Sequence, residues 1–382
     1  MITRRHLARL AGGAGLAIAA PAMIGRAEPA VIRLGQIESL TGPSAPAGVR
    51  GRDGTELALA DLNRKGIEIG GATYKIEITI GDLANDARQA ITLLRQYAAT
   101  DAICSIGPTN SVGYLPIVPV AGQLKFPIVG DGSAAPIKVW NPYAYRVNPT
   151  NVSATPILLR QVVKKENIKR LAVLYDQTQD AQRADSEICK EMAGPLGYEI
   201  VAFEAFRTGD PDFSPQISTI RAARPNAVFL AAAPADGIKM APQIRDAGIE
   251  VPMLTGSGSF QDPAYWNGTK GQINGCYTWI ALDLQAPSPE LKSFVDAYRA
   301  AHNGLLPAAN CTFGADALYT VAAALKAAGK VERGALGEAL AVLDTVTPIG
   351  THVHFKNPPH GDNLDPVAFA IQVNGPGTYV RI

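Results

Sequence analysis

Two glycine- and hydroxyl-rich segments each follow a short apolar run in the first half of the sequence. One is Gly107-Pro108-Thr109-Asn110-Ser111, and the other extends from Gly130 to Pro136. We interpret both as junctions where a buried strand ends and a helix begins. Backbone N–H groups are unpaired at a helix start and the helix dipole favours negative charge there, so the pattern predicts an anion site to which Ser111 adds a hydroxyl. Alternatively, Ser111 and Ser133 only cap their helices.

The short motifs that carry catalysis or bind nucleotides are absent from the sequence. It contains no Gly-x-Ser-x-Gly elbow, no phosphate loop ending in Gly-Lys-Ser/Thr and no Gly-x-Gly-x-x-Gly after a strand. Gly256-Ser257-Gly258-Ser259 has the wrong order for an elbow. His352 and His354 would share one face of a strand, but no carboxylate or thiol completes a metal-ligand spacing, so a solvated strand face is favoured. We therefore expect a protein that is not an enzyme and has neither metal nor cofactor.

Strand-like and helix-like segments alternate in two similar halves, which must position the two junctions. The first half has predicted strands at 31–37, 74–80, 102–106, 128–129 and 144–147, and a helix at 87–98. The second has strands at 171–175, 199–203, 227–232, 252–255 and 276–281, and helices near 181–192, 217–220 and 238–247. This order predicts right-handed βαβ units and mainly parallel sheets. Ligands bind beyond the carboxyl ends of such strands, where both junctions lie.

Two further helices follow the second half. Apolar residues at helical spacing mark one at 291–298, and an alanine-rich segment marks another at 313–328, with Gly329 as its C-cap. The tail from His352 alternates like a strand. We expect this late helical pair to cross back and pack on the first lobe.

Composition and the N-terminus restrict the class of protein. The 382 residues suggest two domains, and the formal net charge of +1 gives no electrostatic footprint for nucleic acid. Arg4 and Arg5 precede an apolar stretch at 11–24 and small residues up to Ala27. This stretch is too short to span a membrane, so residues 1–27 are expected to be a signal peptide, with the mature chain beginning near Glu28. The paired arginines resemble a twin-arginine export signal, and an ordinary Sec signal is the alternative.

The four cysteines do not form a disulfide scaffold in a chain of this length. Cys104 and Cys189 lie in apolar or helical segments and are expected to be buried thiols. Cys276 and Cys311 are the one pair that we consider for a bridge.

Several motifs together resemble the branched-chain amino acid (Leu/Ile/Val) binding proteins of ABC importers. They are Leu40-Thr41-Gly42-Pro43, Ala60 to Gly66, Gly107 to Ser111, Gly132-Ser133-Ala134, Asp212-Phe213-Ser214 and Ile244 to Gly248. The resemblance implies an α/β, type I periplasmic-binding fold with two Rossmann-like lobes and a three-strand hinge crossing near Asn148, Trp279 and Gly350. The N-terminal lobe would comprise 28–148 and 280–349, and the C-terminal lobe 149–279 and 350–382. A monomer in the periplasm would deliver its ligand to an inner-membrane ABC permease.

The resemblance also implies a binding site with several departures from the family pattern. Ser111, beside Asn110, and the loop formed by Gly132, Ser133 and Ala134 would hold the ligand carboxylate. Ala47 stands where an aromatic residue often covers the ligand, and Asp180 and Ala233 stand where tyrosines are expected. Ser257, followed by Gly258, replaces the acid that pairs with the ligand ammonium. Asn85 and Asn110 replace the paired cysteines of the family's first lobe.

Loss of the ammonium-pairing acid leaves two ligand classes open. A desolvated ammonium without a partner is costly, so an amino acid would need another acid, for which Asp180 is the candidate. Otherwise the larger, less aromatic pocket would suit an aromatic or aliphatic organic acid. A ligand-sensing receptor domain and a binder of amides or urea are alternatives with the same fold.

Overall fold

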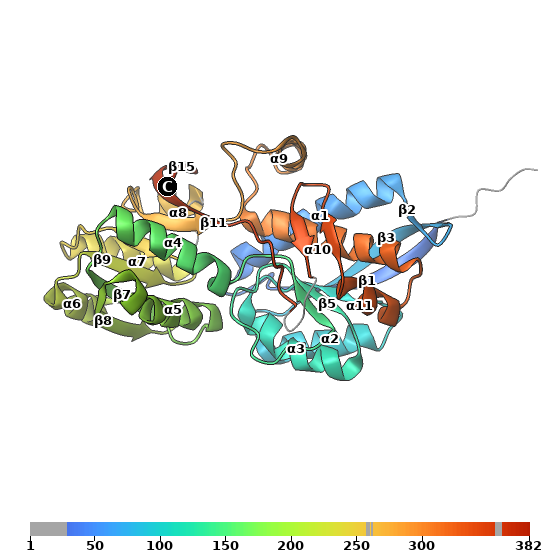
Figure 1. Cartoon of the computed structure of the whole chain (residues 1–382), viewed down its shortest axis with the longest axis horizontal. Coiled ribbons are helices and arrows are strands. Elements are labelled where there is room, and N and C mark those ends of the chain that lie inside the picture. The colour runs from blue at the N-terminus through green and yellow to red at the C-terminus, as the bar shows by residue number, and fades with distance from the viewer. Residues whose placement is uncertain (1–28, 257–259, 261–262, 356–360) are drawn as a thin grey trace, which may run out of the picture.

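The computed structural model describes residues 29–256, 260, 263–355 and 361–382, which form two α/β lobes lying side by side (Figure 1). Each lobe is built on one large sheet, and the C-terminus lies in the second lobe. No helix in these ranges is long and apolar enough to span a membrane. The predicted α/β two-lobe fold is confirmed.

The sheet of the first lobe has six strands in the order β2-β3-β1-β4-β5-β6. Their bounds are Ile67–Ile69, Ala72–Asp82, Ala30–Glu38, Ser105–Ile106, Ile128–Gly130 and Ala144–Arg146. All neighbours are parallel except β2 and β3, which form an antiparallel pair. The carboxyl ends of β1, β4 and β5 therefore meet at one edge, and the residues that follow them reach a common site.

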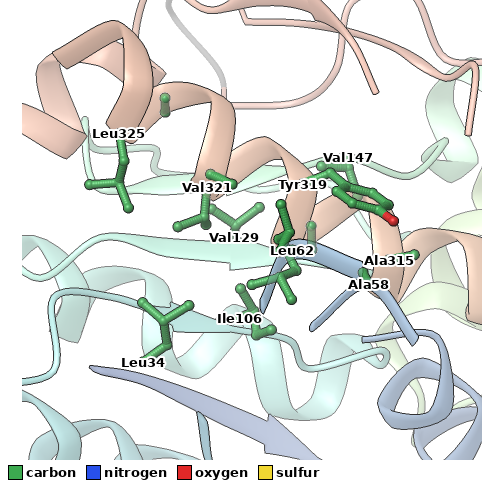
Figure 2. Packing of buried hydrophobic residues seen from close by; sticks show 14 of the residues in the cluster. Leu34, Ala58, Leu62, Ile106, Val129, Val147, Ala315, Tyr319, Val321 and Leu325 are labelled. Atoms are coloured by element: carbon green, nitrogen blue, oxygen red, sulfur yellow. The ribbon is translucent and has the colours of Figure 1, made fainter. Parts of the chain in front are cut away.

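Helices cover both faces of this sheet. They are α1 (Ala45–Lys65), α2 (Ala87–Ala98), α3 (Ser111–Leu124), α9 (Pro289–Ala301), α10 (Ala309–Ala328) and α11 (Arg333–Leu340). On one face, Leu62 of α1 and Leu325 of α10 pack with Leu34 and Val129 of the sheet (Figure 2). On the other, α2 and α3 form a separate cluster. The late helices pack on the first lobe as predicted, and α10 ends at Gly329 in a left-handed conformation (φ 68°).

The second lobe has a seven-stranded sheet in the order β15-β14-β11-β10-β9-β7-β8. The strands are Thr378–Arg381, Phe369–Gly375, Tyr277–Ile280, Met253–Thr255, Ala227–Ala231, Arg170–Asp176 and Glu199–Phe206. Its helices are α4 (Asn151–Lys165), α5 (Asp180–Leu196), α6 (Ser214–Ala223), α7 (Pro234–Asp246) and α8 (Pro263–Gly268). Every residue of β9 is buried, as expected for a central parallel strand with helices on both faces. Only the C-terminal pair β14 and β15 joins this sheet antiparallel.

Within the described residues the chain passes between the lobes three times, and the third passage comes later than expected. After α11, a hairpin of β12 (Asp344–Val346) and β13 (His352–His354) follows. Val353 and Phe355 belong to the core of the first lobe, and Asn363 N–H donates to the carbonyl of Arg146 in β6 (2.9 Å). The crossing placed near Gly350 therefore lies between Asn363 and the start of β14, and residues 350–355 and 361–363 pack with the first lobe.

Helices α1 and α10 approach each other through glycine. A Cβ added to Gly54 would lie 1.8 Å from the carbonyl oxygen of Cys311, and one on Gly314 would lie 2.0 Å from that of Gly51. No side chain fits between backbones at that separation. The start of α10 is thereby held beside the start of α1, which matters because both helix starts line the cleft between the lobes.

All four cysteines are free and buried. Cys276 lies in a core cluster of the second lobe and Cys311 in the core of the first, so the bridge considered between them is wrong. Cys104 and Cys189 are buried thiols, as predicted. Burial raises the pKa of Cys276 to about 11, so this thiol is a small apolar side chain at neutral pH.

Candidate functional site

A cleft of about 170 Å³ lies between the two lobes. An apolar cavity of about 150 Å³ holds benzene, so this volume suits a small solute. The starts of five helices and one loop line it, and the lining residues are Pro43, Ser44, Pro46, Ala47, Arg50, Thr109, Asn110, Ser111, Gly132, Ala134, Gln179, Ala181, Gln182, Ala233, Pro234, Ala235, Ala308, Ala309 and Asn310. Of the predicted site residues, Ala47, Asn110, Ser111, Gly132, Ala134 and Ala233 are therefore in the cleft.

The start of α3 forms the polar end of the first-lobe wall. Asn110, not Ser111, is its N-cap, because Asn110 Oδ1 accepts from Gly113 N–H (2.8 Å). Ser111 Oγ instead accepts from Ala135 N–H and from Ser133 Oγ, each at 3.1 Å. The alternative that Ser111 merely caps its helix is thus wrong. Its hydroxyl faces the loop after β5, and these two segments come together as the sequence predicted.

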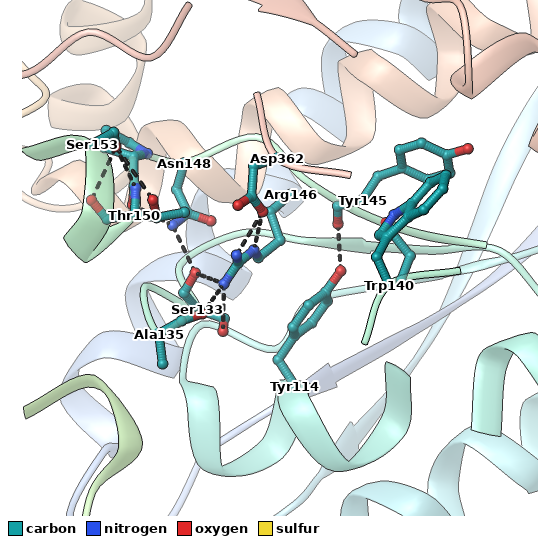
Figure 3. Close-up of polar contacts among 12 residues, drawn as sticks. Tyr114, Ser133, Ala135, Trp140, Tyr145, Arg146, Asn148, Thr150, Ser153 and Asp362 are labelled. Atoms are coloured by element: carbon teal, nitrogen blue, oxygen red, sulfur yellow. Dashed lines mark hydrogen bonds and ion pairs between the residues drawn. The ribbon is translucent and has the colours of Figure 1, made fainter. Parts of the chain in front are cut away.

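The loop after β5 does not start a helix, contrary to the prediction for residues 130–136. Its carbonyls are taken by a side chain instead: Arg146 Nη1 donates to the carbonyls of Ser133 (3.0 Å) and Ala135 (2.5 Å), as Figure 3 shows. Ser133 is fully buried and is not a lining residue. Gly132 is required by close approach, because a Cβ there would lie 2.6 Å from the Thr109 carbonyl oxygen. Gly132 and Ala134 are the residues of this loop that line the cleft.

The second-lobe wall consists of the starts of α5 and α7. Their N-cap residues, Gln179 and Ala233, make no side-chain capping bond, so the first N–H groups of both helices depend on other partners. Asp180 does not line the cleft, and its carboxylate pairs with Arg183 three residues along α5. Ser257 and Gly258 lie outside the described residues.

The charges near the cleft are unevenly distributed. Among the described lining residues, Arg50 is the one with a formal charge. Two fully buried carboxyl groups lie behind Thr109: Glu38 Oε2 accepts from Thr109 N–H (3.1 Å) and Oγ1 (3.0 Å), and Asp131 lies against Glu38. Burial and the Asp131 charge raise the pKa of Glu38 well above its usual range, and burial raises that of Asp131 to about 6. Through its two hydrogen bonds, the Glu38 carboxyl group fixes Thr109 from behind.

Sequence reasoning missed several lining residues, chiefly Arg50, Thr109, Gln182 and Asn310. Arg50 lies in the second turn of α1 and Asn310 in the first turn of α10, and the glycine contacts described above bring these parts of the two helices together. The motif at Leu40 to Pro43 was one available signal, since it leads directly into α1.

The histidines near the C-terminus pair with carboxylates. His352 Nε2 lies 2.8 Å from Asp344 Oδ1, and His354 Nδ1 lies 2.8 Å from Asp365 Oδ2. Both aspartates come from outside the strand, so spacing did not reveal them. Within the described residues, no group of three or more His, Cys, Asp or Glu side chains is placed to hold a metal ion.

Comparison with known proteins identifies the family. The family model for the periplasmic binding protein matches residues 31–375. The chain belongs to the periplasmic binding protein family. A periplasmic binding protein relative, the Leu/Ile/Val-binding protein homolog 1 of Brucella suis biovar 1 (strain 1330), is 25% identical over 327 residues, covering 82% of this chain and 83% of the relative. The predicted resemblance to the Leu/Ile/Val-binding group is confirmed.

Solved periplasmic binding protein structures share the fold. The leucine binding protein LivK from Thermotoga maritima MSB8 superposes with a TM-score of 0.82 at 22% identity, covering 92% of this chain and 97% of that one. A solute binding protein of an ABC transporter from R. palustris in complex with benzoate gives 0.79 at 19% identity, covering 92% and 95%. The two neighbours differ in ligand class, so the fold leaves the ligand of this periplasmic binding protein open.

Proposed function

We propose that this chain is the periplasmic solute-binding component of an ABC importer and captures a small carboxylate between its two lobes. The observation that carries the proposal is the cleft itself, which takes residues from both lobes and whose first-lobe wall joins the start of α3 to the loop at Gly132. Backbone N–H groups at helix starts favour an anion. Three passages of the chain between the lobes provide a hinge, so a ligand that bridges both walls shifts the population toward the closed form.

An organic acid without an ammonium group is our first choice of ligand. Asp180, the acid proposed to pair with an ammonium, has its carboxylate on Arg183 and is outside the cleft lining. None of the described lining residues carries a carboxylate, whereas Arg50 carries a positive charge. The volume and the alanine-rich walls suit a benzoate-sized or short aliphatic acid.

A branched-chain amino acid is the second candidate. The observation in its favour is the matched relative, whose name states Leu/Ile/Val binding and which covers most of this chain. The position assigned to the family's ammonium-pairing acid, Ser257, lies outside the described residues.

Location and partner follow from the same proposal. Residues 1–27 would export the chain and be removed, and the closed protein would dock as a monomer on an inner-membrane permease. Twin-arginine and Sec export remain the two routes.

Calorimetric titration with matched ligands tests the proposal. Benzoate and its neutral isostere benzamide differ in charge, and 4-methylpentanoate and L-leucine differ in the ammonium. We expect binding of an acid but not of benzamide, and a smaller radius of gyration in the complex by X-ray scattering. Ser111→Ala should weaken binding by about 1.5–3 kcal/mol through loss of one hydrogen bond to a charged group, whereas the exposed control Ser218→Ala should not. Binding of L-leucine but not of 4-methylpentanoate would show that the ligand is an amino acid and not an organic acid without an ammonium group. If none of these four compounds binds, the proposal of a carboxylate ligand is refuted.

A further inference from the structure

A fully buried arginine connects the ligand loop to the hinge. Arg146 ends β6, two residues before the first passage to the second lobe, and its side chain has no solvent exposure. Such a charge requires compensation. It is provided by Asp362, whose Oδ1 accepts from Arg146 Nε (2.7 Å) and lies 2.6 Å from Nη2 (Figure 3).

The other end of the same guanidinium holds the cleft loop. Nη1 donates to the Ser133 and Ala135 carbonyls, and Asn148 Nδ2 donates to the same Ser133 carbonyl at 3.0 Å. Gly132 and Ala134, which alternate with these residues, line the cleft. The loop's inward carbonyls are thus fixed by one planar group, and the guanidinium geometry determines where the cleft-facing backbone lies.

The first-lobe segment that leads into the third passage is attached to the same residue through its backbone. Arg146 N–H donates to the Gly361 carbonyl (2.7 Å), and the Arg146 carbonyl accepts from Asn363 N–H (2.9 Å). Asp362 therefore lies in a short strand-like segment beside β6, immediately before the chain returns to the second lobe at β14. Movement of this segment must displace either the ion pair or the guanidinium.

We propose that Arg146 is a positioning residue that couples the ligand loop to the third hinge passage through Asp362. This coupling rests on the proposed function, in which ligand binding at the loop accompanies a change in the orientation of the lobes. A ligand that orders residues 131–135 stabilises one placement of Arg146 and hence of Asp362. Conversely, closure of the lobes stabilises the loop geometry that binds the ligand, as linkage requires.

The test changes Asp362, next to the third passage, and measures amide exchange in the ligand loop at residues 131–135. Asp362→Asn keeps the size of the side chain and the Arg146 contacts to the loop but removes the compensating charge. Hydrogen–deuterium exchange of the unliganded full chain should show roughly tenfold faster exchange at the amides of residues 131–135. Arg146→Lys, which keeps the charge but cannot donate to both carbonyls and Asp362 at once, should show the same local change.

Arg333→Met provides a matched control. Arg333 also lies in the first lobe, donates to two carbonyls (Ala102 and Thr100) and stacks over an aromatic ring, Phe126. This variant should leave exchange at residues 131–135 unchanged. Uniformly faster exchange across the first lobe in Asp362→Asn, or unchanged exchange in the loop, would overturn the coupling.

Ligand affinity gives a second measurement with benzoate and L-leucine as probes. Asp362→Asn should weaken whichever probe binds the wild-type chain by about fivefold or more, since coupling energies between sites are typically in that range. An affinity equal to wild type would contradict the coupling. If neither probe binds the wild-type chain, that result counts against the proposed ligand classes, and loop exchange alone decides the coupling.

Discussion

Asp131→Asn tests the buried carboxyl pair behind the cleft. Asp131 and Glu38 are fully buried against each other, and burial raises the pKa of Asp131 from 3.8 to about 6. Below pH 4 the group is protonated in both the folded and the unfolded chain. Between pH 4 and 6 the unfolded chain releases its proton first, so the free energy of unfolding falls as the pH rises through this window and stays lower above it.

The size of the effect follows from the pKa change. A rise from 3.8 to about 6 corresponds to roughly 3 kcal/mol of stability that is present in acid and lost by neutral pH. The neutral asparagine amide has no such titration and can donate to Glu38. We therefore expect Asp131→Asn to be more stable than wild type at pH 7 by about 1–3 kcal/mol, with the advantage disappearing at pH 4.

Urea unfolding at a series of pH values between 4 and 8 measures this difference. Surface carboxylates such as Asp86 and Asp212, whose pKa values are lowered by backbone and side-chain hydrogen bonds, contribute equally to both proteins and cancel. Asp246→Asn, at an exposed position, is the control for the removal of a carboxylate. A flat difference curve for Asp131→Asn over the same range would refute the raised pKa of Asp131.

Three further substitutions test the cleft and the helix contact that supports it. Gly132→Ala should reduce ligand affinity tenfold or more, measured by calorimetry, because its Cβ would meet backbone atoms of Thr109 at 2.6 and 2.9 Å and displace the loop. Gly54→Ala should lower the free energy of unfolding by about 1–3 kcal/mol through overpacking of α1 on α10. Gly334→Ala is the control, because a Cβ added at this helix position meets open space, and it should be neutral or slightly stabilising. Asp180→Ala should leave the affinity of the bound acid unchanged, and a large loss of L-leucine affinity would restore its ammonium role.

Local patterns were sufficient to predict most of the framework. The buried apolar runs that became β7 and β9, and the helical spacing that became α2, are encoded within short windows. The consecutive junctions after β4 and β5 then followed from the rule that parallel strands share a carboxyl edge. That reasoning brought Ser111 and Gly132 together in the structure because it depends on strand order and not on side-chain detail.

The predictions that failed depended on contacts between residues distant in the sequence, or on which nearby group binds a given side chain. Residues 130–136 form a loop because Arg146 binds its carbonyls, and Arg146 is in turn held by Asp362, 216 residues later. Asp180 was the candidate partner of a ligand ammonium, but its carboxylate pairs with Arg183, one helical turn away. Neither partner choice is visible in hydrophobic periodicity.

The two walls of the cleft are held with different firmness, and this suggests an order of binding. The first-lobe wall is fixed from behind by buried polar groups: Glu38 holds Thr109, and Arg146 holds the loop at Gly132. The second-lobe wall consists of helix starts without side-chain caps, at Gln179 and Ala233. A preorganised wall loses little conformational entropy when a ligand binds, and the uncapped helix starts of the second wall can offer N–H groups to the ligand once the lobes approach. We therefore expect the ligand to dock on the first lobe and the second lobe to close over it.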